Sequence, residues 1–235
     1  PGLKEATQHA RGAPNRAPCF FGKASRSFFV CLGYNKKMIT INNPDFNIAK
    51  IADSGQCFRL RQNAQNGYAL IAHGRVLSIR QTPEGCVLDC DQVEFDALWR
   101  SYFDLDTDYA VIRAKADPED SFLQHACDYG TGIRMLRQDP WEMLISFIIS
   151  QRKNIPAIQY CIEVLSARYG DLLEGTGEAR LYAFPSAQRL AALNEQEFLA
   201  CSLGYREKYV LAAARMVASG ALDLAEIAAL PDDAL

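Results

Sequence analysis

The sequence predicts an α+β fold in which an antiparallel β-rich part precedes a helical part. Short segments that alternate apolar and polar residues occur between residues 39 and 90. After residue 104 the apolar residues recur at helical spacing, and no further strand is expected. Strands followed by helices in this order are typical of α+β architecture. We expect a basic unstructured leader or tail at 1–37, a β-rich domain at 38–114 and a helical domain at 115–235.

Composition excludes several classes of protein. Apolar residues make up 49% and charged residues 23% of the chain, as in an ordinary globular protein. The eight cysteines form no CxxC pair and only three histidines accompany them, so we expect no zinc site, no cofactor and a reducing compartment. No apolar run approaches the length of a membrane span.

Charge is divided unevenly along the chain. Residues 1–37 carry seven lysines or arginines and one glutamate, although the whole chain has a net charge of −3. We interpret this segment first as an upstream tail, or an over-extended reading frame, without function; an Arg-rich targeting leader is the alternative. Met38 is a candidate natural start. The acidic remainder argues against a non-specific nucleic-acid binder.

The β-rich part reads as an antiparallel meander with one helix after it. Asn66-Gly67 is a strong hairpin signal. A short helical turn is expected at 46–51, and an amphipathic helix at Phe95–Phe103. The expected strands are Ile39–Ile41, Cys57–Arg61, Tyr68–Ala72, Val76–Arg80 and Cys86–Cys90.

The helical part centres on one strongly apolar helix. Asp139 is a good N-cap and Pro140 suits the first helical position. Residues 141–149 are apolar on several faces, which predicts a helix buried in the middle of a domain. Gly170 and Gly220 are expected to stop helices. The expected helices are Tyr109–Lys115, Ser121–Asp128, Trp141–Ser150, Pro156–Tyr169, Ser186–Ala192, Glu195–Cys201, Lys208–Ser219 and Asp223–Leu230.

Three loops carry residue types suited to chemistry. The apolar helix ends in the cationic tip Gln151-Arg152-Lys153-Asn154, where Asn154 can cap the next helix; an ordinary inter-helix turn is the alternative. Gly55 precedes a strand, where the missing Cβ permits close approach, although most such glycines only make turns. In Leu203-Gly-Tyr-Arg-Glu-Lys208 an aromatic lies beside cations, suited to wedging into a base stack; a glycine cap before a charged helix is the alternative.

Four separated motifs resemble the 8-oxoguanine DNA glycosylases of the helix–hairpin–helix superfamily. They are Ser54-Gly-Gln-Cys-Phe-Arg59, Arg134-Met-Leu-Arg-Gln-Asp-Pro140, Ser146-Phe-Ile-Ile-Ser150 and Leu203-Gly-Tyr-Arg206. The resemblance runs from about Met38 to the last residue. It implies a twisted antiparallel N-terminal domain followed by a helical glycosylase domain.

The resemblance also implies roles for single residues. The lesion would be flipped out of the duplex, and the Gly55 carbonyl would accept the N7–H that 8-oxoguanine has and guanine lacks. Tyr205 would wedge beside the orphaned cytosine and Arg206 would hydrogen-bond to it. Gln151, Arg152, Lys153 and Asn154 would fill the gap in the duplex, and Lys208 would join the DNA contacts.

The sequence departs from the family pattern in two places. The best-known members have three asparagines where Arg152-Lys153-Asn154 stands, and an arginine where Ala157 stands. Arg152 would then either replace the gap-filling asparagine or relax the preference for the opposite base. The family's nucleophilic lysine, which forms a Schiff base, and its aspartate lie beyond Leu235. We therefore assign no catalytic residue and expect a truncated glycosylase that is inactive as it stands.

The leading hypothesis is a glycosylase with AP lyase activity for oxidised purines in double-stranded DNA. We expect a monomer without a membrane partner, cytoplasmic in bacteria or nuclear in eukaryotes. A monofunctional glycosylase for alkylated purines and a non-catalytic binder of damaged DNA remain as alternatives. An unrelated helical interaction module, in which the motifs serve only packing, is a fourth.

Overall fold

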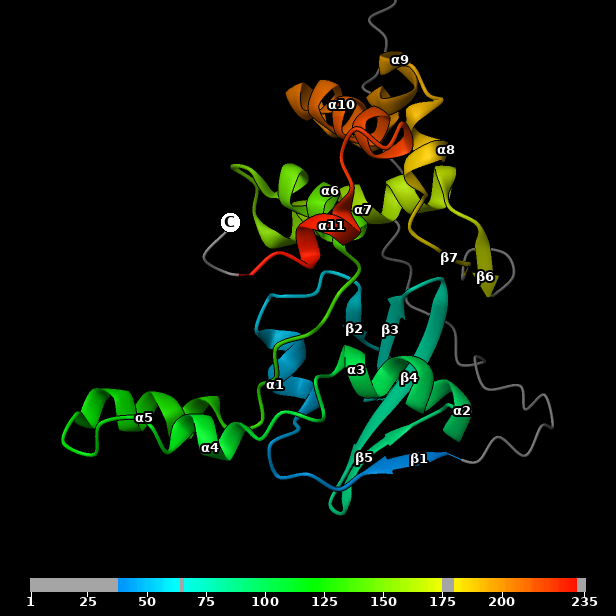
Figure 1. The fold of residues 1–235 in the computed structure, drawn as a ribbon. Helices are drawn as coiled ribbons and strands as arrows, with labels where there is room; N and C mark the ends of the chain where they lie inside the picture. Colours follow the sequence, from blue (N-terminus) through cyan, green and yellow to red (C-terminus); the bar gives the residue numbers. More distant parts are fainter. Residues whose placement is uncertain (1–37, 64–65, 175–179, 232–235) are drawn as a thin grey trace, which may run out of the picture. The chain divides into compact units, whose positions relative to one another are not determined.

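The computed structural model describes residues 38–63, 66–174 and 180–231. The predicted basic leader at 1–37 lies outside the described residues. The order of elements confirms the α+β class: the antiparallel sheet comes first and most of the helices follow it (Figure 1).

Five antiparallel strands form the main sheet. Their order is β1 (Ile39–Ile41), β5 (Gly85–Leu88), β4 (Arg75–Thr82), β3 (Tyr68–Ala72) and β2 (Leu60–Gln62). The register places Leu70 opposite both Leu60 and Leu77, so the apolar members of alternate positions share one face. The hairpin predicted at Asn66-Gly67 is confirmed, because it joins β2 to β3. Strand β2 begins three residues later than predicted, since the chain turns at Cys57–Arg59.

Two helical segments complete the first hydrophobic core. Helix α1 (Ile48–Asp53) buries Ile48 and Ile51. The helix predicted at Phe95–Phe103 is a continuous helical run made of α2 (Gln92–Glu94), the π-helical η1 (Phe95–Trp99) and α3 (Arg100–Tyr102). Trp99 is fully buried in this core. Its indole N–H donates to the Glu94 carboxylate at 3.0 Å, which removes the cost of burying a free donor.

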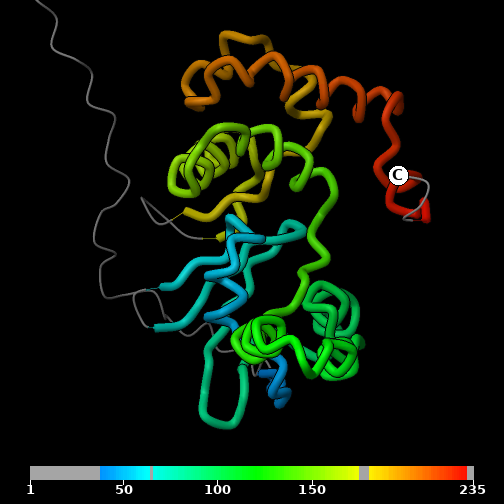
Figure 2. Tube along the Cα trace, turned by 90° about the vertical axis from the view of Figure 1, so that its left-hand side faces the viewer, coloured from blue at the N-terminus to red at the C-terminus, as the bar shows by residue number. Residues whose placement is uncertain are grey.

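The remaining helices surround a second core. α10 (Glu207–Ala218) lies against α6 (Pro140–Ser150) and α8 (Ala187–Ala191), and α6 contacts α7 (Ile155–Tyr169) (Figures 1 and 2). Ile145, Ile162 and Phe198 are fully buried in this core. The other helical elements are α4 (Tyr109–Arg113), α5 (Ser121–Gly130), α9 (Glu195–Phe198), η2 (Leu199–Cys201), η3 (Gly204–Arg206) and α11 (Leu224–Ala228).

The helix caps follow the sequence closely. Asp139 accepts a hydrogen bond from the Glu142 amide at 2.9 Å, and Pro140 occupies the first turn of α6. Asn154 accepts from the Ala157 amide at 3.0 Å at the start of α7. Both predicted helix starts are therefore confirmed.

One expectation for the second half was wrong, because strands do occur after residue 104. Two short strands, β6 (Leu172–Glu174) and β7 (Leu181–Tyr182), pair antiparallel after α7, and they are too short to show an alternating pattern. The helix stop predicted at Gly170 is confirmed, because α7 ends at Tyr169 and Gly170 is its C-cap, with a φ of −86°. A Cβ at Gly170 would lie 1.9 Å from the Ala183 carbonyl oxygen, so close approach of two backbones requires the glycine.

Candidate functional site

Gly55 lies in a left-handed turn just after α1. Its φ is +77°, a conformation that glycine adopts without strain. A Cβ built at Gly55 would lie 3.7 Å from Ile155 Cδ1, an ordinary contact distance. Ile155 is the first residue of α7. The Gly55 backbone therefore lies beside the start of α7, directly after the predicted tip at 151–154.

Hydrogen bonds from Gln56 hold this turn against the segment that precedes α6. The Gln56 side-chain amide donates to the Ser54 hydroxyl and to the Arg134 carbonyl, each at 2.9 Å. Its carbonyl oxygen accepts from the Leu136 amide at 2.8 Å. Gln138 donates to the Gln56 backbone carbonyl at 2.5 Å. Two of the four sequence motifs thus meet here, and together they fix the Gly55 turn.

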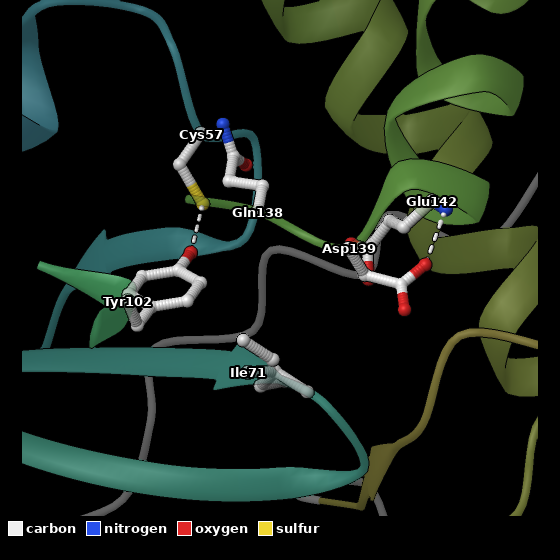
Figure 3. A pocket seen from close by; sticks show the side chains of 7 residues that line it. Cys57, Ile71, Tyr102, Gln138, Asp139 and Glu142 are labelled. Atoms are coloured by element: carbon white, nitrogen blue, oxygen red, sulfur yellow. Dashed lines mark hydrogen bonds between the residues drawn. The ribbon is translucent and has the colours of Figure 1, made fainter. Parts of the chain in front are cut away.

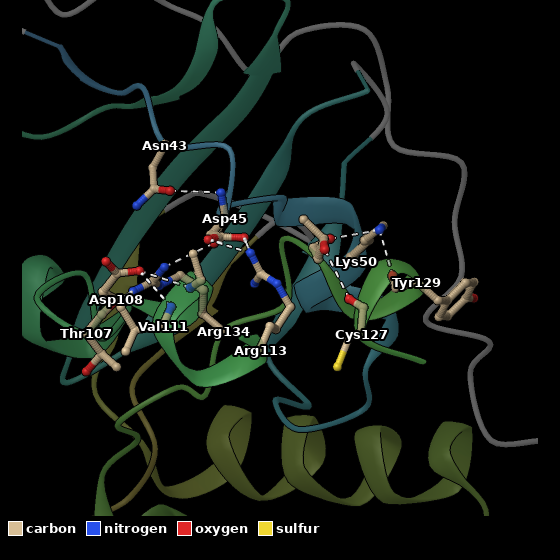
Figure 4. Close-up of polar contacts among 12 residues, drawn as sticks. Asn43, Asp45, Lys50, Thr107, Asp108, Val111, Arg113, Cys127, Tyr129 and Arg134 are labelled. Atoms are coloured by element: carbon tan, nitrogen blue, oxygen red, sulfur yellow. Dashed lines mark hydrogen bonds and ion pairs between the residues drawn. The ribbon is translucent and has the colours of Figure 1, made fainter. Parts of the chain in front are cut away.

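Arg134 organises the segment to which the turn is attached. Its side chain is fully buried and donates to four backbone carbonyls (Figure 4). The acceptors are Phe103 at 2.9 Å, Asp45 at 3.1 Å, Thr107 at 2.8 Å and Asp104. A buried guanidinium with this many acceptors binds the loop after α3 to the sheet half of the molecule.

The rest of the same motif also has structural partners. The Arg137 guanidinium donates to Asp104 Oδ1 at 2.7 Å. Burial alone would raise the pKa of Asp104, but hydrogen bonds from Arg137, Tyr109 and Thr107 outweigh it and lower that pKa. The motif at 134–140 therefore positions the Gly55 turn and starts α6.

A small cavity lies between the sheet and the start of α6. Its volume is about 10 Å³, and Cys57, Tyr102, Gln138 and Glu142 line it (Figure 3). A space of this size holds at most one water, so it cannot accept a nucleobase. Burial raises the pKa of Glu142 to about 7, although the nearby Arg59 opposes the shift. Glu142 is a half-buried residue that the motif pattern did not single out.

Arg59, from the first motif, joins the sheet to the helical half. It is almost completely buried and donates to the Tyr182 carbonyl in β7. Its Nε lies 3.5 Å from Glu163 Oε1 in α7. The role of Arg59 is therefore to connect the two hydrophobic cores.

The predicted tip between α6 and α7 is a tight turn. Gln151 has φ −52° and ψ 113°, Arg152 has φ 55°, and the Lys153 amide donates to the Ser150 carbonyl at 3.0 Å. These values describe a type II turn with Arg152 at its left-handed position. We call residues 151–154 the first finger. Gln151, Arg152 and Asn154 are exposed, whereas Lys153 is half-buried.

The loop at 202–206 forms a second finger beside the first. Tyr205 is 57% exposed, as expected of a wedge. Arg206 is only 6% exposed, and its guanidinium lies 4.4 Å from the Tyr205 ring centroid. It donates to the Leu203 carbonyl at 3.2 Å and to the Gln151 carbonyl in the first finger. Lys208 is exposed in α10.

An apolar groove runs between α6 and α10, next to both fingers. Its volume is about 540 Å³, and Gln151, Tyr205 and Arg206 belong to its lining. Phe147, on α6, is 66% exposed in this groove. Helix α6 packs against α7, α10 and α11, as expected of a helix in the middle of a domain, but one of its apolar faces lines this open groove. Most of the lining is apolar: Leu144, Phe147, Ile148, Tyr209, Ala212, Ala213, Met216 and Leu222.

The described residues contain no group of three His, Cys, Asp or Glu side chains placed to hold a metal ion. None of the helices in the described ranges is long and apolar enough to cross a membrane.

Comparison with known proteins gives a consistent result. The N-terminal domain of 8-oxoguanine DNA glycosylase matches residues 38–144. An "N-glycosylase/DNA lyase" of Saccharomyces cerevisiae is 28% identical over 200 residues, which cover 78% of this chain and 53% of the yeast protein. The chain thus spans about half the length of this curated relative.

Solved structures extend the match to the fold. The apo form of Clostridium acetobutylicum 8-oxoguanine glycosylase/lyase is 37% identical with a TM-score of 0.77, covering 82% of this chain and 67% of that one. The same enzyme bound to double-stranded DNA with cytosine opposite 8-oxoguanine has a TM-score of 0.76 at 37% identity, covering 81% and 65%.

Proposed function

Because the chain belongs to the 8-oxoguanine DNA glycosylase family, we propose that the full-length protein carrying this sequence excises 8-oxoguanine-type purines from duplex DNA and cleaves the resulting abasic site. It acts as a monomer wherever the genome is held, in the bacterial cytoplasm or the eukaryotic nucleus. The observation that carries this proposal is the Gly55 turn, which hydrogen bonds hold in place beside the start of α7, directly after the first finger.

The Gly55 carbonyl oxygen recognises the oxidised base. An oxidised guanine carries an N7–H donor, whereas guanine presents a lone pair at N7. A carbonyl oxygen in a fixed position accepts a hydrogen bond from the N7–H of the oxidised guanine and repels the N7 lone pair of guanine. One hydrogen bond therefore discriminates between the two bases. The hydrogen bonds of Gln56 and Gln138 give this carbonyl its fixed position. The small cavity at Glu142 plays no part in base binding, because a base does not fit into it.

The two fingers hold the duplex open. Tyr205 is exposed at the tip of the second finger and stacks against the bases that flank the flipped nucleotide. The exposed side chains of Gln151, Arg152 and Asn154 fill the gap, and Lys208 contributes a phosphate contact. For Arg206 to reach the orphaned cytosine, its guanidinium must exchange the Gln151 carbonyl for an acceptor on the base.

Strand cleavage requires an amine nucleophile that forms a Schiff base with C1′. We assign this role to none of the lysines that the structure describes. Lys50 donates to the Tyr129 and Thr131 carbonyls at 2.7 and 2.8 Å, and Lys153 is likewise bound to a carbonyl.

Single-turnover excision by the full-length protein tests the proposal. Duplexes carrying 8-oxoguanine, 3-methyladenine or guanine opposite cytosine are compared. We expect release of 8-oxoguanine and retention of guanine. Tyr205→Ala should slow excision about 10- to 100-fold, because an aromatic–base stack contributes about 1–3 kcal/mol. Tyr129→Ala is the matched control, since this residue is 81% exposed on α5. Preferential release of 3-methyladenine, or equal rates for both variants, contradicts the proposal.

A further inference from the structure

Lys153 belongs to the first finger but its ammonium group is turned toward the second. Its Nζ donates to the Ser202 carbonyl at 2.9 Å and lies 3.4 Å from Cys161 Sγ. The Cys161 thiol donates to the same carbonyl at 3.4 Å. The side chain is half-buried, whereas its neighbours in the finger are exposed. This position differs from the DNA contact that the sequence predicts.

A second hydrogen bond runs between the fingers in the opposite direction. Arg206, from the second finger, donates to the Gln151 carbonyl of the first. Each finger therefore supplies one cation and one carbonyl to the other. The two loops are linked by reciprocal side-chain-to-backbone bonds, although about 50 residues separate them in sequence.

Both acceptors are carbonyls that helices leave unpaired. Gln151 follows the last residue of α6, and Ser202, with φ 56°, follows η2. Carbonyls at helix C-termini lack an intrahelical donor and carry partial negative charge, so they attract cations. Lys153 and Arg206 each cap the helix end of the other finger. This explains why a lysine at position 153 points inward.

We propose that Lys153 is a positioning residue that fixes the spacing of the two fingers before DNA arrives, and that it does not contact phosphate. The inference rests on the proposed function and deepens it. When Arg206 turns to the cytosine, the bond from Arg206 to Gln151 is lost. The bond from Lys153 to Ser202 then remains as the link that keeps the Tyr205 wedge in register with the gap-filling loop.

The first test needs no DNA. Amide hydrogen exchange is measured in the free full-length protein for Lys153→Met, which keeps the aliphatic stem and removes the donor. We expect the rate of amide exchange to rise about fivefold in residues 202–206. A loss of protection of this size is typical when one partly exposed, charged hydrogen bond is removed. Lys153→Arg should restore most of the protection. Unchanged exchange in the second finger overturns the proposal, whatever the protein does to DNA.

The second test separates positioning from phosphate binding. Binding of an 8-oxoguanine duplex is measured as a function of salt for the wild type, Lys153→Met and the control Lys208→Met. A lysine that contacts phosphate contributes about 0.9 to the slope of log affinity against log salt. We expect Lys153→Met to keep the wild-type slope while single-turnover excision slows about fivefold, and Lys208→Met to lower the slope. A lowered slope for Lys153→Met, or an unchanged excision rate, overturns the proposal.

Discussion

Arg134 and Arg206 are both buried arginines in motifs that resemble those of the glycosylase family, yet their surroundings differ. Arg134 donates to four backbone carbonyls that lie far from the fingers. Arg206 donates to two carbonyls, and its buried Nε has no hydrogen-bond partner among the described residues. Each nitrogen of the Arg134 guanidinium has an acceptor, so this side chain supports the fold, whereas Arg206 has a buried nitrogen without an acceptor among the described residues and can change partner.

The same contrast separates the two regions. The segment that holds the Gly55 turn is a frame in which Gln56, Arg134 and Gln138 have settled partners. The fingers expose Arg152 and Tyr205 and rest on two reciprocal bonds. Mutations in the frame should therefore lower the stability of the protein, whereas mutations in the fingers should lower its activity.

Replacing the central arginine of the frame should have the largest effect. Arg134→Met leaves four buried carbonyls without their donor, and we expect the free energy of unfolding to fall by about 3–5 kcal/mol. Arg137→Met is the control, because that side chain is 65% exposed and its ion pair should contribute about 1 kcal/mol or less. Urea denaturation of both variants measures the difference. Similar losses would show that the frame does not depend on Arg134.

Glu142 should make the stability of the frame depend on pH. Its raised pKa of about 7 means that the folded state keeps a proton that the unfolded chain releases near pH 4.5. The free energy of unfolding should thus fall by about 3 kcal/mol as pH rises from about 4.5 to 8, and then level off. Glu142→Gln should abolish this fall and be more stable than the wild type at pH 8.

Denaturation curves between pH 4 and 8 provide the measurement for Glu142. Glu163→Gln serves as its control, because it removes the ion pair with Arg59 while Glu142 stays in place. That variant should retain the loss of stability with rising pH. A Glu142→Gln protein that still loses stability over the same range would contradict the assignment.

The smallest effect is expected at the tip of the first finger. Arg152 has φ 55° at a turn position that asparagine occupies more readily. Arg152→Asn should raise the free energy of unfolding by about 0.5–1 kcal/mol, since the left-handed strain is relieved. The same variant should sharpen the preference for lesions opposite cytosine. Thermal unfolding and excision from all four base pairings measure both effects, and identical profiles would exclude a role in reading the partner base.

Local patterns predicted much of the fold. Alternation gave the strand Tyr68–Ala72 with its observed bounds, and the cap residues Asp139 and Asn154 placed the starts of α6 and α7. The short strands β6 and β7 could not be predicted, because strands of three and two residues are too short to show a periodic pattern. Their pairing depends on Gly170 approaching the Ala183 backbone, a contact between distant positions.

The directions in which the site's side chains point could not be predicted from the sequence. The residue types of both fingers suggested DNA contacts, and Tyr205 is indeed exposed. Lys153 and Arg206 instead reach carbonyls about 50 positions away, and only the packing of α7 against η2 brings these together. The pKa of Glu142 has the same origin, since its burial arises from the sheet half of the molecule.

Borohydride trapping of the full-length protein on matched duplexes tests the central claim most directly. One duplex carries 8-oxoguanine opposite cytosine and the other carries guanine at the same position. We expect a covalent protein–DNA adduct with the lesion duplex alone, because only 8-oxoguanine donates N7–H to the Gly55 carbonyl and is excised. Equal trapping on both duplexes, or none on the lesion duplex, would contradict it.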